Sequence, residues 1–219
     1  MENFSPPGKR GSIAVGLLLR MVLWLAGIYF PLTASSASAI FTQTGLPELL
    51  QQSYVYANTL PAIESGPRNR PALIVFFDPV CPLGAKEWQA LQAYREQLHI
   101  RWVPVGAIDP HSEALSALIL SDEHPVLALA HNEARLLQSP ASPRAATPAP
   151  TLYALSLVRN NTHYWQRNFG VLPLLLYPSQ TGIHALYGRA SAAELQQIAQ
   201  TVLAFGQRKA RPQNTEEER

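Results

Sequence analysis

The residue with the clearest chemical potential is Cys81, the single cysteine of the chain. It lies in the segment Asp78-Pro79-Val80-Cys81-Pro82, between an apolar run and a segment with helical periodicity. A cysteine at the start of a helix is close to free backbone N–H groups and to the positive end of the helix dipole, which favour the thiolate. Pro82 suits the first helical turn, where its missing N–H is not needed. We therefore predict a surface thiolate that attacks disulfides or is oxidised to a sulfenic acid. The alternative is a small buried apolar residue, a common environment for free cysteine.

A single cysteine excludes several kinds of site. The chain cannot form an intrachain disulfide, a C-x-x-C pair or a cysteine-rich zinc site. The spacing of four histidines matches no metal motif and indicates surface or capping residues, although two of them, seven apart, could share a helix face. A hydrolase with Cys81 as nucleophile and one of these four histidines as base is an alternative. We expect no metal and no cofactor. The four histidines considered as metal ligands or bases are His111, His124, His131 and His163.

The segments around Cys81 alternate between strand and helix patterns. The apolar run 72–77 is typical of a buried strand, and helical spacing over 85–98 places Trp88, Leu91 and Leu98 on one face. The proline-rich stretch 139–150 is expected to be a loop. Further expected elements are a strand at 99–105, helices at 114–120, 126–137, 152–159 and 162–169, strands at 174–177 and 183–187, and a helix at 191–205 that opens with a Ser191/Glu194 capping box.

The order of these elements indicates the fold. Strand, helix, strand, helical region, hairpin and helix is the order of a thioredoxin-like α/β domain. We predict such a domain at 71–206, with a helical insertion at about 107–169. Residues 40–70 are expected to be a lead-in with one short amphipathic piece at 46–56, and residues 207–219 a flexible tail.

The first 39 residues have the pattern of an export signal. Lys9 and Arg10 precede an apolar stretch interrupted only by Arg20, and Ala37-Ser38-Ala39 has the form that signal peptidase cleaves. The uninterrupted apolar part, 21–32, is shorter than the roughly 20 residues of a membrane span. The alternative is an uncleaved anchor. Both interpretations place the remaining residues in the periplasm, with membrane contact only through an uncleaved N-terminal segment.

The distribution of charge argues against a nucleic-acid partner. The net charge of +2 comes from 17 basic and 15 acidic side chains. Three of the basic and one of the acidic side chains lie in the first 39 residues, which leaves 14 of each in the rest of the 219-residue chain. A neutral body without a basic stripe is not typical of a nucleic-acid-binding protein.

Two segments resemble one known family. The segment from Val75 to Pro82 is similar to the active-site turn F-x-D-P-x-C-P-Y-C of periplasmic thiol:disulfide interchange proteins of the DsbC/DsbG type, which have the thioredoxin fold. The segment from Phe169 to Tyr177 resembles the G-V-x-x-T-P-x-x-x-Y segment of the same family, whose proline is cis and packs beside the reactive cysteine. The resemblance implies that Cys81 is catalytic, and that Pro82, Leu172 and Pro173 contact the substrate.

The departures from the family pattern restrict the chemistry. Gly84 replaces the second cysteine, and Leu172 stands where the family usually has Thr or Val. The short lead-in also leaves no room for the family's N-terminal dimerisation domain. We expect a monothiol oxidoreductase or isomerase-like protein that forms mixed disulfides with periplasmic protein thiols and disulfides. An external thiol reductant would release these adducts, or the protein would cycle through a sulfenate.

A second function from a different class fits the same departures. Gly84 and Leu172 are also compatible with a non-catalytic thioredoxin-like module that binds or scaffolds an envelope, secretion or conjugation assembly.

Overall fold

The computed structural model describes residues 47–139 and 149–210. The expected signal peptide or anchor, its cleavage site, most of the proline-rich loop and the last nine residues of the tail lie outside these ranges. Within them, no helix combines the length and apolarity needed to cross a membrane.

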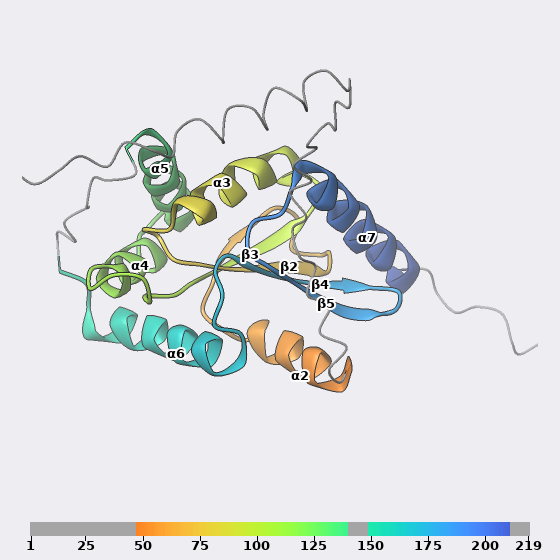
Figure 1. Cartoon of the computed structure of the whole chain (residues 1–219), viewed down its shortest axis with the longest axis horizontal. Coiled ribbons are helices and arrows are strands. Elements are labelled where there is room, and N and C mark those ends of the chain that lie inside the picture. Colours follow the sequence, from red (N-terminus) through yellow and green to blue (C-terminus); the bar gives the residue numbers. More distant parts are fainter. Residues whose placement is uncertain (1–46, 140–148, 211–219) are drawn as a thin grey trace, which may run out of the picture. The chain divides into compact units, whose positions relative to one another are not determined.

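The described residues form one five-stranded sheet with the strand order β1-β3-β2-β4-β5 (Figure 1). β2 and β3 are parallel, and the other neighbouring pairs are antiparallel. β2 is the central strand, and all six of its residues are buried, as its continuous apolar sequence predicts. The strands are β1 (Ile63–Ser65), β2 (Ala72–Phe77), β3 (His99–Pro104), β4 (Leu174–Ser179) and β5 (Gly182–Tyr187).

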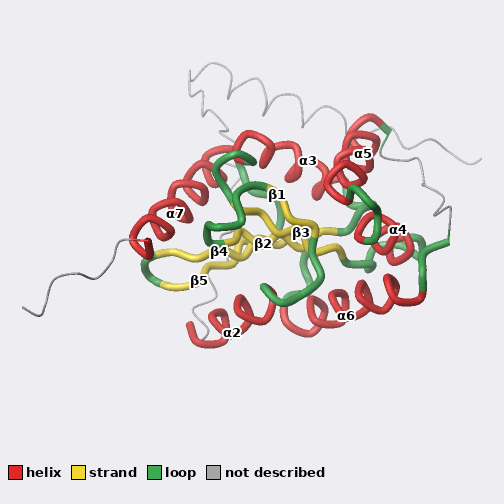
Figure 2. The backbone as a smooth tube through the Cα atoms, turned by 180° about the vertical axis from the view of Figure 1, so that it is seen from behind, coloured by secondary structure: helices red, strands yellow, loops and turns green. Residues whose placement is uncertain are grey.

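Helices cover both faces of this sheet (Figure 2). α3 (Pro82–Leu91) and α7 (Ala192–Ala210) lie on one face, and α2 (Pro47–Ala57) and α6 (Leu152–Asn168) lie on the other. Alternate side chains of β2 enter the two separate cores, because successive residues of a strand point to opposite faces. The remaining helical elements are the 3-10 turn η1 (Gln92–Tyr94), α4 (Ser112–Leu120) and α5 (Pro125–Gln138).

Most of the expected elements are present, with shifted limits. The helix expected at 85–98, α3, starts at Pro82, directly after Cys81, and gives way to a 3-10 turn after Leu91. The two helices expected at 152–159 and 162–169 are one continuous helix, α6. The capping box is confirmed, since the Ser191 N–H donates to Glu194 Oε2 (2.7 Å) and the Glu194 N–H donates to Ser191 Oγ (3.2 Å). α7 then continues to Ala210, past the expected start of the tail.

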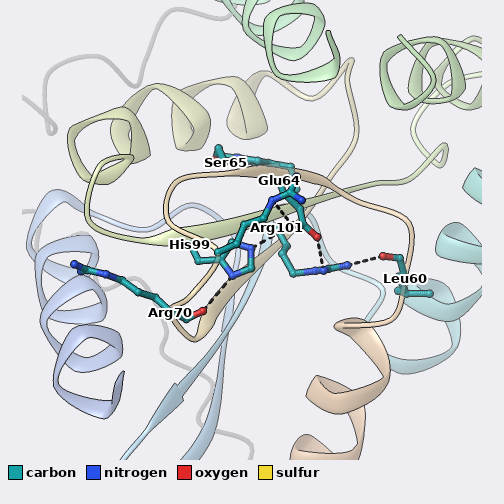
Figure 3. Close-up of polar contacts among 8 residues, drawn as sticks. Leu60, Glu64, Ser65, Arg70, His99 and Arg101 are labelled. Carbon is teal, nitrogen blue, oxygen red and sulfur yellow. Dashed lines mark hydrogen bonds and ion pairs between the residues drawn. The ribbon is translucent and has the colours of Figure 1, made fainter. Parts of the chain in front are cut away.

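Residues 47–70, expected to precede the domain, contribute α2 and the edge strand β1 to it. Glu64 on β1 accepts a hydrogen bond from Arg101 Nη1 on β3 (2.6 Å), and Arg101 Nη2 donates to the Leu60 carbonyl (2.8 Å), as Figure 3 shows. His99 on β3 contacts the Arg70 carbonyl through Nδ1 (3.2 Å). A strand of three residues has too few positions to show an alternating pattern, so β1 was not predictable from its own residues.

Asn161 explains why α6 continues through the polar sequence Asn160-Asn161-Thr162. The Asn161 side chain is buried, and its Nδ2 donates to the carbonyls of Pro61 (2.9 Å) and Pro104 (3.0 Å). It therefore joins the middle of α6 to the end of β3 and to the segment before β1.

We expect Asn161→Ala to lower the free energy of unfolding by about 1–3 kcal/mol, because the carbonyls of Pro61 and Pro104 lose their donor. The neighbouring Asn160 is exposed and serves as the matched control. Asn160→Ala should change the free energy by less than about 0.5 kcal/mol. Urea unfolding measures both, and equal effects of the two substitutions would contradict the assigned role of Asn161.

Glu87 on α3 is a buried carboxyl that contacts the residue before the last helix. Its Oε2 accepts a hydrogen bond from the Ala190 N–H (3.0 Å), and its side chain is fully buried. Burial raises the pKa of Glu87 from 4.5 to about 7, and the hydrogen bond from Ala190 offsets only part of this effect.

This shift predicts a pH dependence of stability. Between pH 4.5 and about 7 the unfolded chain binds fewer protons at Glu87 than the folded chain, so stability should fall as the pH rises through this range. Glu87→Gln should reduce the fall, whereas substitution of the exposed Glu123 by Gln should leave it unchanged. Urea unfolding at a series of pH values tests this, and identical profiles for wild type and Glu87→Gln would refute it.

Candidate functional site

Cys81 occupies the N-cap of α3, as the sequence predicts. Its N–H donates to the Asp78 carbonyl (2.9 Å), which closes the turn after β2, and its carbonyl accepts from the Ala85 N–H (3.1 Å). Pro82 is the first residue of the helix. The end of β2 and the start of α3 therefore fix the backbone of Cys81 on both sides.

The carboxylate of Asp78 fixes this turn to the loop that follows β3. Its Oδ1 accepts from the Val80 N–H (3.1 Å), and its Oδ2 accepts from the N–H groups of Ala107 (2.8 Å) and Ile108 (3.0 Å). The residue is completely buried. Burial raises the pKa of Asp78, and the three backbone hydrogen bonds oppose the rise. Asp78 thus forms an Asx turn with Val80, and the same carboxylate also bridges two loops.

The proline segment lies at the same end of the sheet. The Leu172–Pro173 peptide bond is cis, as the family resemblance implies. Phe76 near the end of β2 pairs with Leu174, the first residue of β4, so Pro173 directly precedes β4 near the end of β2. The Val171 carbonyl accepts from Trp165 Nε1 (2.9 Å), and the Pro173 carbonyl accepts from the Gly188 N–H (2.8 Å). These contacts hold the segment on both sides of Leu172.

The prediction of a surface thiolate at Cys81 is wrong. The residue is only 6% exposed. Burial raises the pKa of the Cys81 thiol, and the carboxylates of Asp78 and Glu133 raise it further. The backbone N–H groups of Gly84 and Leu83, in the first turn of α3, lower the pKa, although the sulfur accepts no capping hydrogen bond from them. The helix N-terminus therefore has the predicted effect, but desolvation outweighs it.

Two buried polar residues of α5 lie behind this turn, and sequence reasoning missed both. Asn132 Nδ2 donates to the Pro79 carbonyl (2.8 Å) and to Oε1 of Glu133 (3.1 Å). Both side chains are fully buried. They share the inner face of α5 with Leu129 and Leu136. A polar pair between apolar residues at this spacing was the signal available in the sequence.

Exposed apolar side chains come from the segments next to the thiol. Leu83, Ile108 and Val171 are between 43% and 51% exposed. Among the residues predicted to contact substrate, Pro82 is exposed, Leu172 is half-buried and Pro173 is buried. A substrate can therefore reach the side chain of Pro82 more readily than that of Pro173.

The histidines do not join this site. The side chains of His111, His124, His131 and His163 are all exposed. The charged groups that act on Cys81 are the carboxylates of Asp78 and Glu133, so a Cys–His hydrolase has no support here. Within residues 47–139 and 149–210, no cluster of His, Cys, Asp and Glu side chains has the arrangement of a metal site.

A cavity of about 680 Å³ lies at the opposite end of β2. Residues that line it include Tyr54, Ala72, His99 and Ser179. Ala72 is the first residue of β2, whereas Cys81 follows its last residue, so this cavity is not part of the thiol site.

Gly84 leaves room for a side chain next to Cys81. A Cβ atom at this position would lie 3.6 Å from the Cβ of Cys81, and 3.8 Å from both the Asp78 carbonyl oxygen and the Cβ of Phe77. These are ordinary contact distances. The Cβ–Cβ separation in disulfides is about 3.5–4.5 Å. The Cβ separation between positions 81 and 84 thus lies within the range that a disulfide requires.

Comparison with solved structures identifies the fold. The chain is similar to the catalytic domain of Proteus mirabilis ScsC, with 21% identity, a TM-score of 0.58, and coverage of 71% of this chain and 98% of that one. A periplasmic thioredoxin-like protein from Salmonella enterica serovar Typhimurium matches at 14% identity and a TM-score of 0.53, covering 71% and 97%. The thiol-disulfide exchange protein alpha-DsbA2 from Wolbachia pipientis matches at 13% identity and a TM-score of 0.50, covering 70% and 96%.

These similarities confirm the expected thioredoxin-like α/β fold. Neither the family models nor the curated proteins give a significant match to the sequence.

We expect Gly84→Cys to convert the site to a dithiol, and its new thiol to form a disulfide with Cys81 without a backbone shift. Leu83→Cys is the matched control, because it adds a thiol one residue earlier, where the side chain is exposed. Thiol titration after air oxidation should find no free thiol in Gly84→Cys and two in monomeric Leu83→Cys. Two free thiols in oxidised Gly84→Cys would contradict the inferred geometry.

Proposed function

We propose that this protein is an exported thiol–disulfide exchange protein of the DsbC/DsbG type that acts through the single cysteine Cys81. The observation that carries the proposal is the position of Cys81 at the N-cap of α3, where the backbone N–H groups of Leu83 and Gly84 lower the pKa of the thiol. These two donors stabilise the thiolate once it forms.

The reaction is a mixed-disulfide exchange. The Cys81 thiolate attacks one sulfur of a substrate disulfide, the substrate S–S bond breaks, and the other substrate sulfur leaves as a thiolate that takes up a proton. A thiol from an external reductant then attacks the mixed disulfide and releases Cys81. If an oxidant reaches Cys81 first, the sulfenic acid that forms is reduced by the same external thiol.

The surroundings of Cys81 favour a protein substrate. Leu83, Ile108 and Val171 offer an exposed apolar rim to a polypeptide chain. Pro82 lies at the surface beside the thiol, and the backbone of Leu172 and Pro173 is held near the end of β2. In this proposal, Pro82, Leu172 and Pro173 position a protein disulfide or thiol of the periplasm.

The proposed location rests on the N-terminal sequence and on the similar structures. Residues 1–39 have the pattern of an export signal or anchor. One of the similar structures is a periplasmic thioredoxin-like protein, and another is a thiol-disulfide exchange protein. Both are consistent with a domain that works in an oxidising compartment.

A second candidate is a non-catalytic thioredoxin-like module that binds or scaffolds an envelope, secretion or conjugation assembly. The burial of Cys81 favours it, because a desolvated thiol with a raised pKa is a weak nucleophile at neutral pH. Gly84 favours it as well, since the chain has no second thiol with which to complete a redox cycle.

The two candidates are separated by trapping adducts in the native host. We expect acid quenching followed by alkylation to reveal reductant-sensitive adducts of the wild-type protein, and Cys81→Ser to abolish them. Disulfide-linked partners identified by mass spectrometry would name the substrates. Absence of adducts, together with retained partner binding and a wild-type phenotype for Cys81→Ser, would support the scaffold instead.

A further inference from the structure

The cavity of about 680 Å³ at the far end of β2 has the size of a ligand site. Its wall is formed by α2, the loop before β2, the turn between β4 and β5, and α7 (Figure 1). A second cavity of about 240 Å³ adjoins it, because Asn69, Arg70, Pro71 and Gly206 line both. Cys81 follows the other end of β2, so binding of a ligand here does not depend on the chemistry of the thiol.

The charged side chains on the wall of the larger cavity are positive. Arg68 and Arg70 both line it, and both are exposed to solvent. No described aspartate or glutamate lines this cavity or the smaller one next to it. A concave surface that carries charge of one sign attracts ligands of the opposite sign.

The nearest carboxylate does not neutralise these two arginines. Glu64 accepts a hydrogen bond from Arg101 (2.6 Å), whose side chain is only 14% exposed, so the buried Arg101 already balances its charge. Arg68 Nε lies 3.0 Å from the other oxygen of Glu64, but the Arg68 side chain is 74% exposed, and such exposed ion pairs are weak.

Arg70 has even less compensation. Its Nη1 donates to the Gln97 carbonyl (2.7 Å), and it forms no ion pair with any residue that the structure describes. Figure 3 shows its side chain extending away from Glu64 and Arg101. The cavity wall therefore carries a net positive charge.

The rest of the wall includes apolar side chains from three elements. Val55 on α2 is 57% exposed, and Ile183 on β5 and Phe205 on α7 are half-buried. Contact with an apolar ligand would remove these side chains from water, which is favourable. A pocket with apolar walls and a few charged groups is typical of small-molecule sites.

We propose that this cavity binds an organic anion with an apolar chain, such as a fatty acid or an alkyl phosphate. The guanidinium groups of Arg68 and Arg70 bind the acidic group, because their planar donors match carboxylate and phosphate oxygens. The chain lies against Val55, Ile183 and Phe205. A small inorganic anion would leave the apolar side chains in water, and an uncharged chain would leave the arginines without a partner.

The rival occupant is the acidic end of the chain itself. Glu216, Glu217 and Glu218 follow α7 in the sequence and carry the required negative charge. Residues 211–219 contain no large apolar side chain, however, so they match the arginines but not the apolar part of the wall.

The test is calorimetric titration of the purified protein with decanoate at pH 7, below the micelle concentration. We expect one decanoate to bind per protein molecule. The double variant Arg68→Gln/Arg70→Gln should bind it at least about tenfold more weakly, because the charge-assisted hydrogen bonds are lost. The uncharged 1-decanol should bind wild type more weakly than decanoate does, and the double substitution should leave its affinity unchanged.

Two matched pairs of variants localise the site. Arg167→Gln removes an exposed arginine of α6 that lines neither cavity, and should leave decanoate binding unchanged. Val55→Glu places a negative charge on the wall and should weaken binding, whereas Leu127→Glu, at a side chain on α5 that is 56% exposed, should not. If the double variant does not fold, the comparison of Val55→Glu with Leu127→Glu decides.

Cosedimentation with phosphatidylglycerol vesicles distinguishes the sources of the anion. Sedimentation of wild type with the vesicles, lost in the double variant, would identify a membrane lipid as the ligand. Binding of decanoate without sedimentation would identify a free amphiphile. Either result would support the site.

Three outcomes would overturn the assignment. One is equal decanoate affinity in wild type and in the double variant, and another is equal affinity of wild type for decanoate and 1-decanol. The third is a wild-type protein that binds no decanoate. If substitution of Glu216, Glu217 and Glu218 by glutamine then restores binding, the occupant is the end of the chain and not a separate amphiphile.

Discussion

The structure around Cys81 depends on the carboxylate of Asp78. Three backbone N–H groups converge on its two oxygens, one from the turn after β2 and two from the loop after β3. A buried carboxylate is tolerated only where such donors surround it. Two loops that follow parallel strands are thereby fixed to each other, and Cys81 is placed at the start of α3 with little freedom to move.

Two opposing effects then act on the sulfur. The N-terminus of α3 supplies N–H groups that favour the thiolate, whereas burial and two neighbouring carboxyl groups favour the thiol. The helix comes with the fold, whereas α5 lies outside the central sheet, packs against α3 and places Asn132 and Glu133 behind the turn. The same thioredoxin-like frame can therefore carry thiols of very different reactivity, which is why the fold alone does not establish the chemistry.

Local patterns were sufficient for the parts of the fold that local interactions determine. The apolar run of β2, the capping box of α7 and the position of Cys81 before Pro82 were predictable because each depends on neighbours within a few residues. β1 and the continuity of α6 were not, since they depend on Arg101 and Asn161 reaching residues far away in the sequence. The burial of Cys81 was missed for the same reason. It depends on tertiary packing, and α5, which packs against α3, lies far downstream in the sequence.

In the proposed reaction, Gly84 would determine how long a covalent adduct at Cys81 persists. In a two-cysteine site, the second sulfur is always at hand and its attack is a first-order event. With glycine there, departure is a second-order event whose speed follows the concentration of reducing molecules in the surroundings. The fraction of the protein that carries a mixed disulfide at Cys81 would therefore depend on the concentration of external thiols in its compartment.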